Sequence, residues 1–236
     1  MKIIALGDTH GRNDWKKVVE ENDFDKIIFI GDYFDSHEEV NPLVQKSNFR
    51  EIISYKKKNK EKVVLLFGNH DFHYLRGITQ TYSGFQIEHY HDIQELLENA
   101  LKENLLQMSF SFNNYLFTHA GVTKTWLNNH GYNEKDNGDV NDFLNTLFEN
   151  KPLSFGFTSG VRRDPYGDDI TQSPIWVRPE SLLEDSIGGF KQVVGHTTQT
   201  DLTFANNIIF IDCIGTSGEF LIIEDGKESV GKVKRD

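Results

Sequence analysis

Short apolar runs recur along the chain, and each ends at a glycine or a polar residue. Four of them are rich in β-branched, leucine or aromatic residues and occupy positions 3–6, 27–30, 63–67 and 115–117, and a shorter one occupies 193–194. Apolar runs of this length that stop at turn residues are typical of strands buried on both faces. The pattern therefore predicts a fold built around a buried sheet.

The segments between the first runs show helical spacing. Trp15, Val18 and Val19 share one face of a helix expected near 13–22, a second helix near 41–59 has Pro42 in its first turn, and a helical pair is expected near 71–102. These helices alternate with strands expected at 2–7, 26–31 and 62–67. The βαβαβ order predicts parallel strands joined by right-handed crossovers.

The second half of the chain has a different organisation. Residues 106–112 and 115–118 flank Asn113-Asn114, which predicts a hairpin with a two-residue turn. Helices near 123–130 and 139–149 follow. Strands near 191–195, 208–213 and 219–224 close the chain, the last two joined by the Gly-Thr-Ser-Gly turn at 215–218. Without an internal repeat or a linker, residues 1–236 are expected to form one domain.

Residues 151–174 are rich in Gly, Pro, Ser and Asp and have no periodicity. An irregular stretch of this length inside a domain is often functional. Because it lies between His119 and His196, we expect it to border the active site.

Polar residues able to bind a metal or move a proton follow the five apolar runs. In chain order they are Asp8 and His10, Asp32 and Asp35, Asn69, His70 and Asp71, His119, and His196. Ligands of open α/β folds gather where strands end, so these side chains are expected at one edge of one sheet. Asp8 and His10 are two apart, which lets them face the same way in extended chain and bind one cation together.

The five motifs together resemble the calcineurin-like metallophosphoesterases. That family pattern runs Asp-x-His, Gly-Asp-x-x-Asp, Gly-Asn-His-Asp, a lone His, and Gly-His-x-His or a shortened Gly-His-Thr, and every block occurs here in order within residues 7–198. The resemblance implies an α/β fold, a four-layer α/β/β/α sandwich of two mixed sheets flanked by helices. It also implies hydrolysis of a phosphoester with two divalent metal ions.

The resemblance assigns a role to each motif residue. Asp8 and His10 would bind the first metal, Asp32 would bridge both, and the second would take Asn69, His119 and His196. His70 would be the general acid with Asp71 orienting it, and Asp35 and Asp212 would orient ligand histidines from behind. His73 is treated as a bystander, and His37 as an ordinary polar residue.

The donor atoms of the predicted ligands limit which metal ions are expected. Oxygen and nitrogen donors without thiolate favour Mn, Fe or Zn, of which we expect Mn first. Two cations about 3.5–4 Å apart neutralise a phosphate ester and lower the pKa of a water that bridges them.

Two departures from the longer family pattern point to one branch. Thr198 replaces a second histidine, which resembles the bacteriophage-type serine/threonine protein phosphatases and the diadenosine tetraphosphatases. Ser36 and His37 stand where that branch has an arginine, so another cation must bind the phosphate beside Asn69. Arg178, in a Trp-containing segment that also resembles the phage enzymes, is the first candidate, and Arg162 or Arg163 the second.

We therefore expect a dinuclear metal-dependent hydrolase of phosphomonoesters similar to serine/threonine protein phosphatases. A diadenosine tetraphosphatase or another nucleotide phosphoesterase is the alternative within enzymes. A non-catalytic binding module of the same fold is the alternative from another class. The expected partner is a phosphorylated substrate, which could be a phosphoprotein, a nucleotide or a small phosphoester.

Composition excludes some partners and places. The formal net charge of −11 disfavours stable binding to nucleic acid, whose phosphates need clustered cations. No apolar run is long enough to cross a membrane, and the first residues lack the features of a signal peptide. Cys213 is the single cysteine, so no internal disulfide can form, and a cytoplasmic location is expected.

Overall fold

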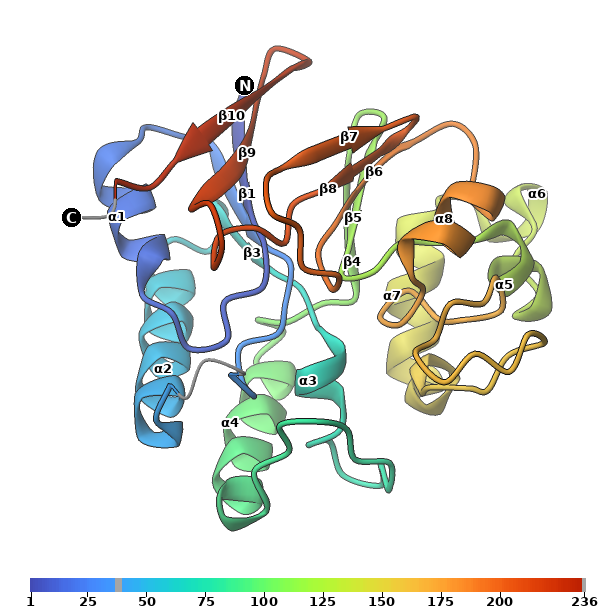
Figure 1. Ribbon diagram of the computed structural model, residues 1–236, viewed down its shortest axis with the longest axis horizontal. Helices are drawn as coiled ribbons and strands as arrows, with labels where there is room; N and C mark the ends of the chain where they lie inside the picture. The colour runs from blue at the N-terminus through green and yellow to red at the C-terminus, as the bar shows by residue number, and fades with distance from the viewer. Residues whose placement is uncertain (37–39, 235–236) are drawn as a thin grey trace.

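Figure 1 shows the computed structural model, which describes residues 1–36 and 40–234. Within these residues the chain forms two mixed sheets of five strands each, flanked by helices. The first sheet has the order β10-β9-β1-β2-β3, with β1 Lys2–Leu6, β2 Lys26–Phe29, β3 Val63–Leu65, β9 Glu219–Glu224 and β10 Lys227–Lys232. The second has the order β4-β5-β6-β8-β7, with β4 Ser109–Phe112, β5 Tyr115–Thr118, β6 Lys191–Val194, β7 Thr203–Ala205 and β8 Ile208–Phe210. The expected fold class is confirmed.

The buried strands of the first sheet divide their side chains between two cores. Ile4 and Leu6 of β1 point into a core shared with Trp15 and Val18 of α1 (Asp14–Glu21) and with α2 (Pro42–Lys58). Ile3 and Ala5 point the other way, into a core shared with Phe117 and Val193 of the second sheet. Because both faces of β1 are covered, its sequence is continuously apolar rather than alternating.

The parallel pairing expected for the first half is confirmed. Strand β1 pairs in parallel with β2, and β2 with β3, through crossovers that contain α1 and α2. In the second sheet, β5, β6 and β8 are also parallel neighbours. The hairpin of β4 and β5 turns at Asn113-Asn114, where Asn113 takes a φ of 52°, a left-handed conformation that asparagine tolerates well.

Helices cover the outer faces of both sheets. Figure 1 shows α1, α2 and α4 (Tyr90–Lys102) on the side of the first sheet. Beside the second sheet lie α5 (Lys124–Asn129), α6 (Glu134–Asn137), α7 (Val140–Asn150) and α8 (Pro179–Asp185). No helix in the part of the chain that the structure describes is long and apolar enough to cross a membrane.

Three predictions about local structure need correction. The helical pair near 71–102 is one turn, α3 (Asn69–Phe72), and the longer α4, separated by an irregular segment with a 3₁₀ turn, η1 (Ile87–His89). The strand expected at 208–213 is shorter, because β8 ends at Phe210, and the 215–218 turn carries the chain from the second sheet to β9 of the first. A second 3₁₀ turn, η2 (Pro152–Phe155), lies in the loop expected at 151–174.

Candidate metal centre

The motif residues come together where strands of both sheets end. Asp8, Asp32 and Asn69 follow β1, β2 and β3 of the first sheet, whereas His119 and His196 follow β5 and β6 of the second. The prediction of one edge of one sheet is therefore wrong. Because the two sheets pack face to face with these parallel strands ending on the same side, one cluster forms between them.

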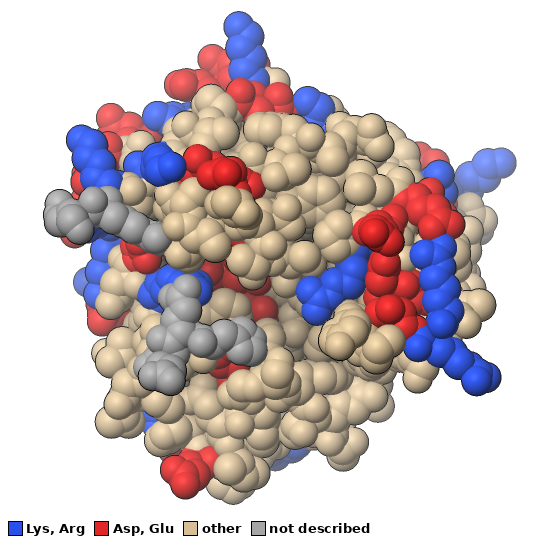
Figure 2. All heavy atoms as spheres, in the orientation of Figure 1, with Lys and Arg blue, Asp and Glu red and all other residues tan. Residues whose placement is uncertain are grey.

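A pocket of about 230 Å³ opens onto this cluster, and it is lined by Asp8, His10, Asp32, Asn69, His70, Tyr82, Ser83, Trp176, Arg178, His196, Thr198 and Asp212. His119 lies fully buried against Asn69. Figure 2 shows that this face of the molecule is hollowed near its middle, where carboxylates are visible inside the hollow and a cationic side chain lies beside it. The structure thus brings together all six predicted metal ligands.

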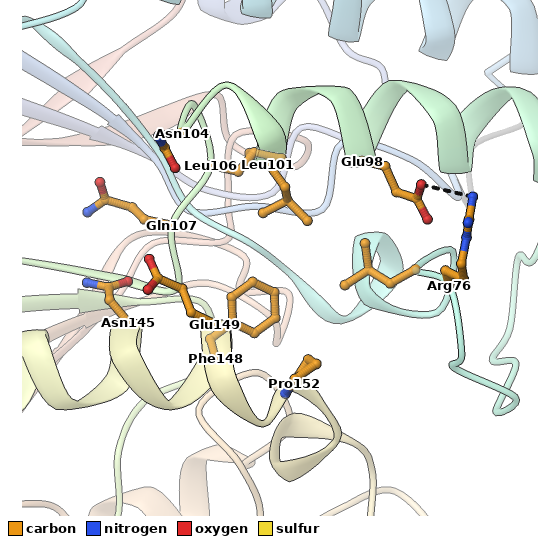
Figure 3. A pocket seen from close by; sticks show the side chains of 11 residues that line it. Arg76, Glu98, Leu101, Asn104, Leu106, Gln107, Asn145, Phe148, Glu149 and Pro152 are labelled. Atoms are coloured by element: carbon orange, nitrogen blue, oxygen red, sulfur yellow. Dashed lines mark hydrogen bonds and ion pairs between the residues drawn. The ribbon is translucent and has the colours of Figure 1, made fainter.

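A larger cavity of about 630 Å³ lies between α4 and α7, and Figure 3 shows it from close by. Its wall is partly apolar, with Leu101, Leu106 and Phe148, and Arg76 forms an ion pair with Glu98 beside it at 3.3 Å. None of the predicted site residues lines this cavity. The concentration of metal-binding groups, rather than size, therefore marks the smaller pocket as the site.

Three of the predicted metal ligands have an uncommon backbone conformation. His10, Asp32 and His196 have φ values of 44°, 51° and 65°, in the left-handed region that non-glycine residues seldom adopt. Such conformations persist only when the surrounding structure determines them, and they concentrate at functional sites.

Glycines make room for the two carboxylates. A Cβ on Gly68 would lie 2.1 Å from Oδ1 of Asp32, and a Cβ on Gly195 would lie 2.2 Å from Oδ1 of Asp8. The glycines of Gly-Asn-His-Asp and Gly-His-Thr are thus required by close approach of the carboxylates.

Each ligand histidine bonds a backbone carbonyl through one ring nitrogen. Nδ1 of His10 donates to the carbonyl of Phe34 at 2.6 Å, and Nδ1 of His119 donates to the carbonyl of Ile30 at 3.0 Å. For His196, Nε2 donates to the carbonyl of Trp176 at 3.2 Å. A carbonyl can only accept, so these nitrogens carry the protons and the opposite nitrogens carry lone pairs.

The opposite nitrogens face oxygen atoms. Nε2 of His119 lies 3.4 Å from Oδ2 of Asp32 and 2.8 Å from Oδ1 of Asn69, and Nε2 of His10 lies 3.8 Å from the same Asp32 oxygen. Nδ1 of His196 lies 2.8 Å from Oδ1 of Asn69. Lone pairs directed at carboxylate and amide oxygens repel one another unless a cation lies between them. The donor set therefore fits divalent metal ions, with Asp32 shared between His10 and His119 as a bridging ligand would be.

Burial sets the charge states of the cluster. Burial, and then repulsion from Asp8, raises the pKa of Asp32, while burial and repulsion from Asp212 raise that of Asp8. Burial lowers the pKa of His119 to about 3 and that of His196 well below its usual value, so both rings are neutral ligands. A bound cation would offset the carboxylate charges that burial makes unfavourable.

The predicted partner of His70 is wrong. The Asp71 carboxylate accepts backbone N–H bonds from Asp32 and Tyr33, both at 2.9 Å, and from Gly68 at 3.0 Å, so it fastens the turns that carry the ligands. Nδ1 of His70 instead donates to Oδ2 of Asp35 at 3.2 Å. The reason is geometric, since His70 and Asp71 are adjacent in a helical turn and adjacent helical residues face different directions.

Asp35 also accepts a hydrogen bond from Nε2 of His73, a histidine that is buried rather than exposed to solvent. Although burial acts in the opposite direction, hydrogen bonds from His70, His73 and Tyr74 hold the pKa of Asp35 at about 2. Within the described residues, two groups have ligand atoms close enough to hold a metal: Asp8 with Asp32 and His119, and Asp35 with His70 and His73.

Only one of the predicted phosphate-binding arginines lines the pocket. Arg178 donates from Nη1 to the Thr197 hydroxyl at 3.1 Å and from Nε to the carbonyl of Tyr166 at 2.9 Å. Arg162 is instead paired with Glu184 and bonded to the Ser181 hydroxyl at 3.2 Å, away from the pocket. Arg163 does not line the pocket either.

The remaining predicted residues take varied positions. Asp212 lines the pocket and accepts a hydrogen bond from the Thr198 hydroxyl at 2.9 Å, and Thr198 is where the longer family motif has histidine. His37 lies outside the described residues. Tyr82 and Ser83 also line the pocket, but no sequence motif surrounds them from which this position could be predicted.

Comparison with known proteins agrees with this geometry. The model of the calcineurin-like phosphoesterase family matches residues 1–197. The chain belongs to the calcineurin-like phosphoesterases, a family that works with a dinuclear metal centre, and it is a metal-dependent phosphoesterase that acts on phosphorylated substrates.

Two solved structures share the fold over nearly all of this chain. A cold-active protein-tyrosine phosphatase of a psychrophilic Shewanella is 20% identical, with a TM-score of 0.57 over 99% of this chain and 80% of that one. A serine/threonine phosphatase from Saccharomyces cerevisiae, similar to human phosphatase PP5, is 14% identical, with a TM-score of 0.57 over 100% of this chain and 81% of that one. No curated protein matches the chain by sequence.

Proposed function

We propose that this chain hydrolyses phosphomonoesters, with phosphoserine and phosphothreonine side chains of proteins as the substrate class. The observation that carries the proposal is the arrangement of His10, His119 and His196. Each gives one N–H to a backbone carbonyl and directs the other nitrogen at Asp32 or Asn69. We propose Mn for this centre, with Fe or Zn as the alternatives, because oxygen and nitrogen donors without thiolate suit all three ions.

The size of the pocket supports a small reacting group. At about 230 Å³ it is smaller than the ~300–1,000 Å³ of sites that enclose drug-sized ligands. A phosphate on a short side chain fits such a pocket better than a dinucleoside polyphosphate does. Tyr82 and Trp176 offer rings that a nucleobase could use, so a nucleotide phosphoesterase is the alternative to be tested.

The residues of the chain divide the work. Asp8, His10, Asp32, Asn69, His119 and His196 would hold two divalent cations, which when bound supply neutralisation of the phosphate and activation of water. Arg178 would donate to a phosphate oxygen that the cations do not reach. His70, held through Nδ1 by Asp35, would deliver a proton from Nε2 to the departing oxygen.

A substrate panel tests the proposal. Protein loaded with Mn would be given phosphoserine, phosphothreonine and phosphotyrosine peptides, mononucleotides, diadenosine tetraphosphate and cyclic nucleotides. The highest kcat/KM should be found with phosphoserine or phosphothreonine peptides. A preference for diadenosine tetraphosphate would establish the alternative, and no turnover of any member would support a binding role.

We also propose a cytoplasmic location, supported by the single, buried Cys213.

A further inference from the structure

The Asp35 carboxylate is the centre of a buried hydrogen-bond network next to the pocket. Its Oδ2 accepts from Nδ1 of His70 at 3.2 Å and from Nε2 of His73 at 2.5 Å. Its Oδ1 accepts from the Tyr74 hydroxyl at 2.6 Å and from Nε2 of Gln86 at 3.0 Å. We propose that His73 is a positioning residue that holds Asp35 Oδ2 against His70, an inference that rests on the proposed acid role of His70.

The hydrogen bonds of His73 determine which ring nitrogen carries its proton. The backbone N–H of Tyr82 donates to Nδ1 of His73 at 3.3 Å. Nδ1 is therefore an acceptor, and in the neutral ring the proton is on Nε2, from which it is donated to Asp35. A cation in the group formed by Asp35, His70 and His73 would need that Nε2 to be bare, so this group is a hydrogen-bond network rather than a third metal site.

His73 acts on the oxygen that matters for His70. Both histidines share Oδ2, whereas Tyr74 and Gln86 hold Oδ1. Asp35 has a left-handed φ of 59°, a conformation that its contacts must maintain. Without His73, Oδ2 would keep, among the described residues, only its bond to His70, and the carboxylate could turn about its bonds to Tyr74 and Gln86.

The ring of His73 is itself firmly held. It stacks on Tyr82 with an interplanar angle of 10° and meets Tyr74 and Phe85 edge-on at centroid distances of 4.5 and 4.9 Å. Tyr82 also lines the pocket. Tyr82 in the pocket wall and the His73–Asp35 support of the proposed general acid are thus packed against each other.

Three variants test this role. His73→Phe keeps the ring volume and removes the donor, His73→Gln replaces it with an amide N–H near the position of Nε2, and Tyr74→Phe is the matched control, because it removes a donor from the other oxygen of Asp35. Each would be loaded with Mn, checked for metal content and thermal unfolding, and assayed on an alkyl phosphate and on p-nitrophenyl phosphate. The aryl leaving group needs little protonation, so the rate on p-nitrophenyl phosphate should fall with any defect of the site except loss of the general acid.

We expect His73→Phe to lower kcat for the alkyl ester by about 10- to 100-fold, the usual effect of an outer hydrogen-bond partner, and to lower it far less for the aryl ester. His73→Gln should recover most of the loss, and Tyr74→Phe, which leaves both bonds to Oδ2 in place, should change the ratio of the two esters much less than His73→Phe does. In a His70→Asn background, His73→Phe should have no further effect on the ratio. Equal loss on both esters, or a loss that adds to that of His70→Asn, would overturn the proposal.

A measurement on the unaltered protein keeps the test decisive if His73→Phe does not fold. The ¹⁵N chemical shifts of the histidine rings in Zn-loaded protein should show His73 protonated on Nε2, and protonation on Nδ1 would overturn the proposal. If His70→Asn itself spares alkyl esters, the acid role of His70 fails. The tautomer of His73 separates that failure from a failure of the His73–Asp35 bond.

Discussion

Replacing Asp35 with asparagine should slow the reaction without emptying the metal centre. The carboxylate accepts a hydrogen bond from Nδ1 of His70, and Asp35 does not line the pocket that holds the proposed metal ligands. Asparagine is of similar size but has no charge, and one of its two terminal groups is a donor. The variant therefore keeps the packing of the site and weakens the support of one catalytic side chain.

The size of the effect follows from the contact that is lost. The bond joins a buried histidine to a carboxylate whose pKa is held at about 2, so the charged form of Asp35 persists across the working pH range. A hydrogen bond to a charged group contributes about 1.5–3 kcal/mol. If this contribution is realised in the transition state, kcat should fall by roughly 10- to 100-fold, since each ~1.4 kcal/mol is a factor of ten.

The assay compares Asp35→Asn with Asp71→Asn. Asp35→Asn should keep the metal content of the wild type and lose activity mainly on alkyl esters. Asp71→Asn should weaken metal binding, lower the stability of the protein and lower activity on all substrates alike, because Asp71 fastens the backbone of Asp32 and Gly68. Loss of metal in Asp35→Asn, or an alkyl-selective defect in Asp71→Asn, would refute the assignment of Asp35 as the partner of His70.

Three further predictions concern Arg178 and the metals. Arg178→Ala should lower kcat/KM by roughly 10- to 100-fold, as expected for loss of a charge-assisted contact, and should weaken inhibition by inorganic phosphate. The control Arg162→Ala should change neither quantity. Unchanged phosphate inhibition in Arg178→Ala would show that Arg178 does not bind the phosphate. Chelation of the metals should lower Tm by about 5–10 °C per site at saturation near 100 Kd, measured by scanning calorimetry, and an unchanged Tm would argue against metals bound to the folded state. Asp32→Asn should show less metal per chain by elemental analysis. As the pH rises above about 4, however, metal-free Asp32→Asn should lose less stability than metal-free wild type does. The sign follows because the folded-state pKa of Asp32 is raised, so its contribution to stability is lost as pH rises above the unfolded-state pKa. Equal pH dependence in both metal-free proteins would contradict it.

The sequence predicted those parts of the structure that depend on local pattern. Strands β1, β2 and β3 are covered on both faces, so their apolar runs stand out, and the residues that follow them are confirmed as neighbours in one pocket. Strands β7 and β10 have no such run. The β10 segment is largely polar, and Val230, its one apolar residue, is half-exposed, so no periodicity could indicate a strand.

The predictions that failed depend on tertiary geometry. The family resemblance assigned Asp71 as the partner of His70, but the direction of side chains in a helical turn gives that contact to Asp35, 35 residues away. The same limit applies to the arginines. Arg162 lies in the long irregular segment and Arg178 lies shortly after it, so sequence pattern cannot tell the two apart. The tertiary structure shows that Arg162 forms an ion pair with Glu184, whereas Arg178 lines the pocket.

The central claim is that two divalent cations bound by this cluster drive phosphomonoester hydrolysis. The most direct measurement titrates Mn into chelator-treated protein while following both bound metal and phosphate release from a phosphoserine peptide. Activity should rise until two ions are bound per chain and then stay constant, and Asp32→Asn should fail to reach this occupancy. Full activity with one ion or none bound would contradict it.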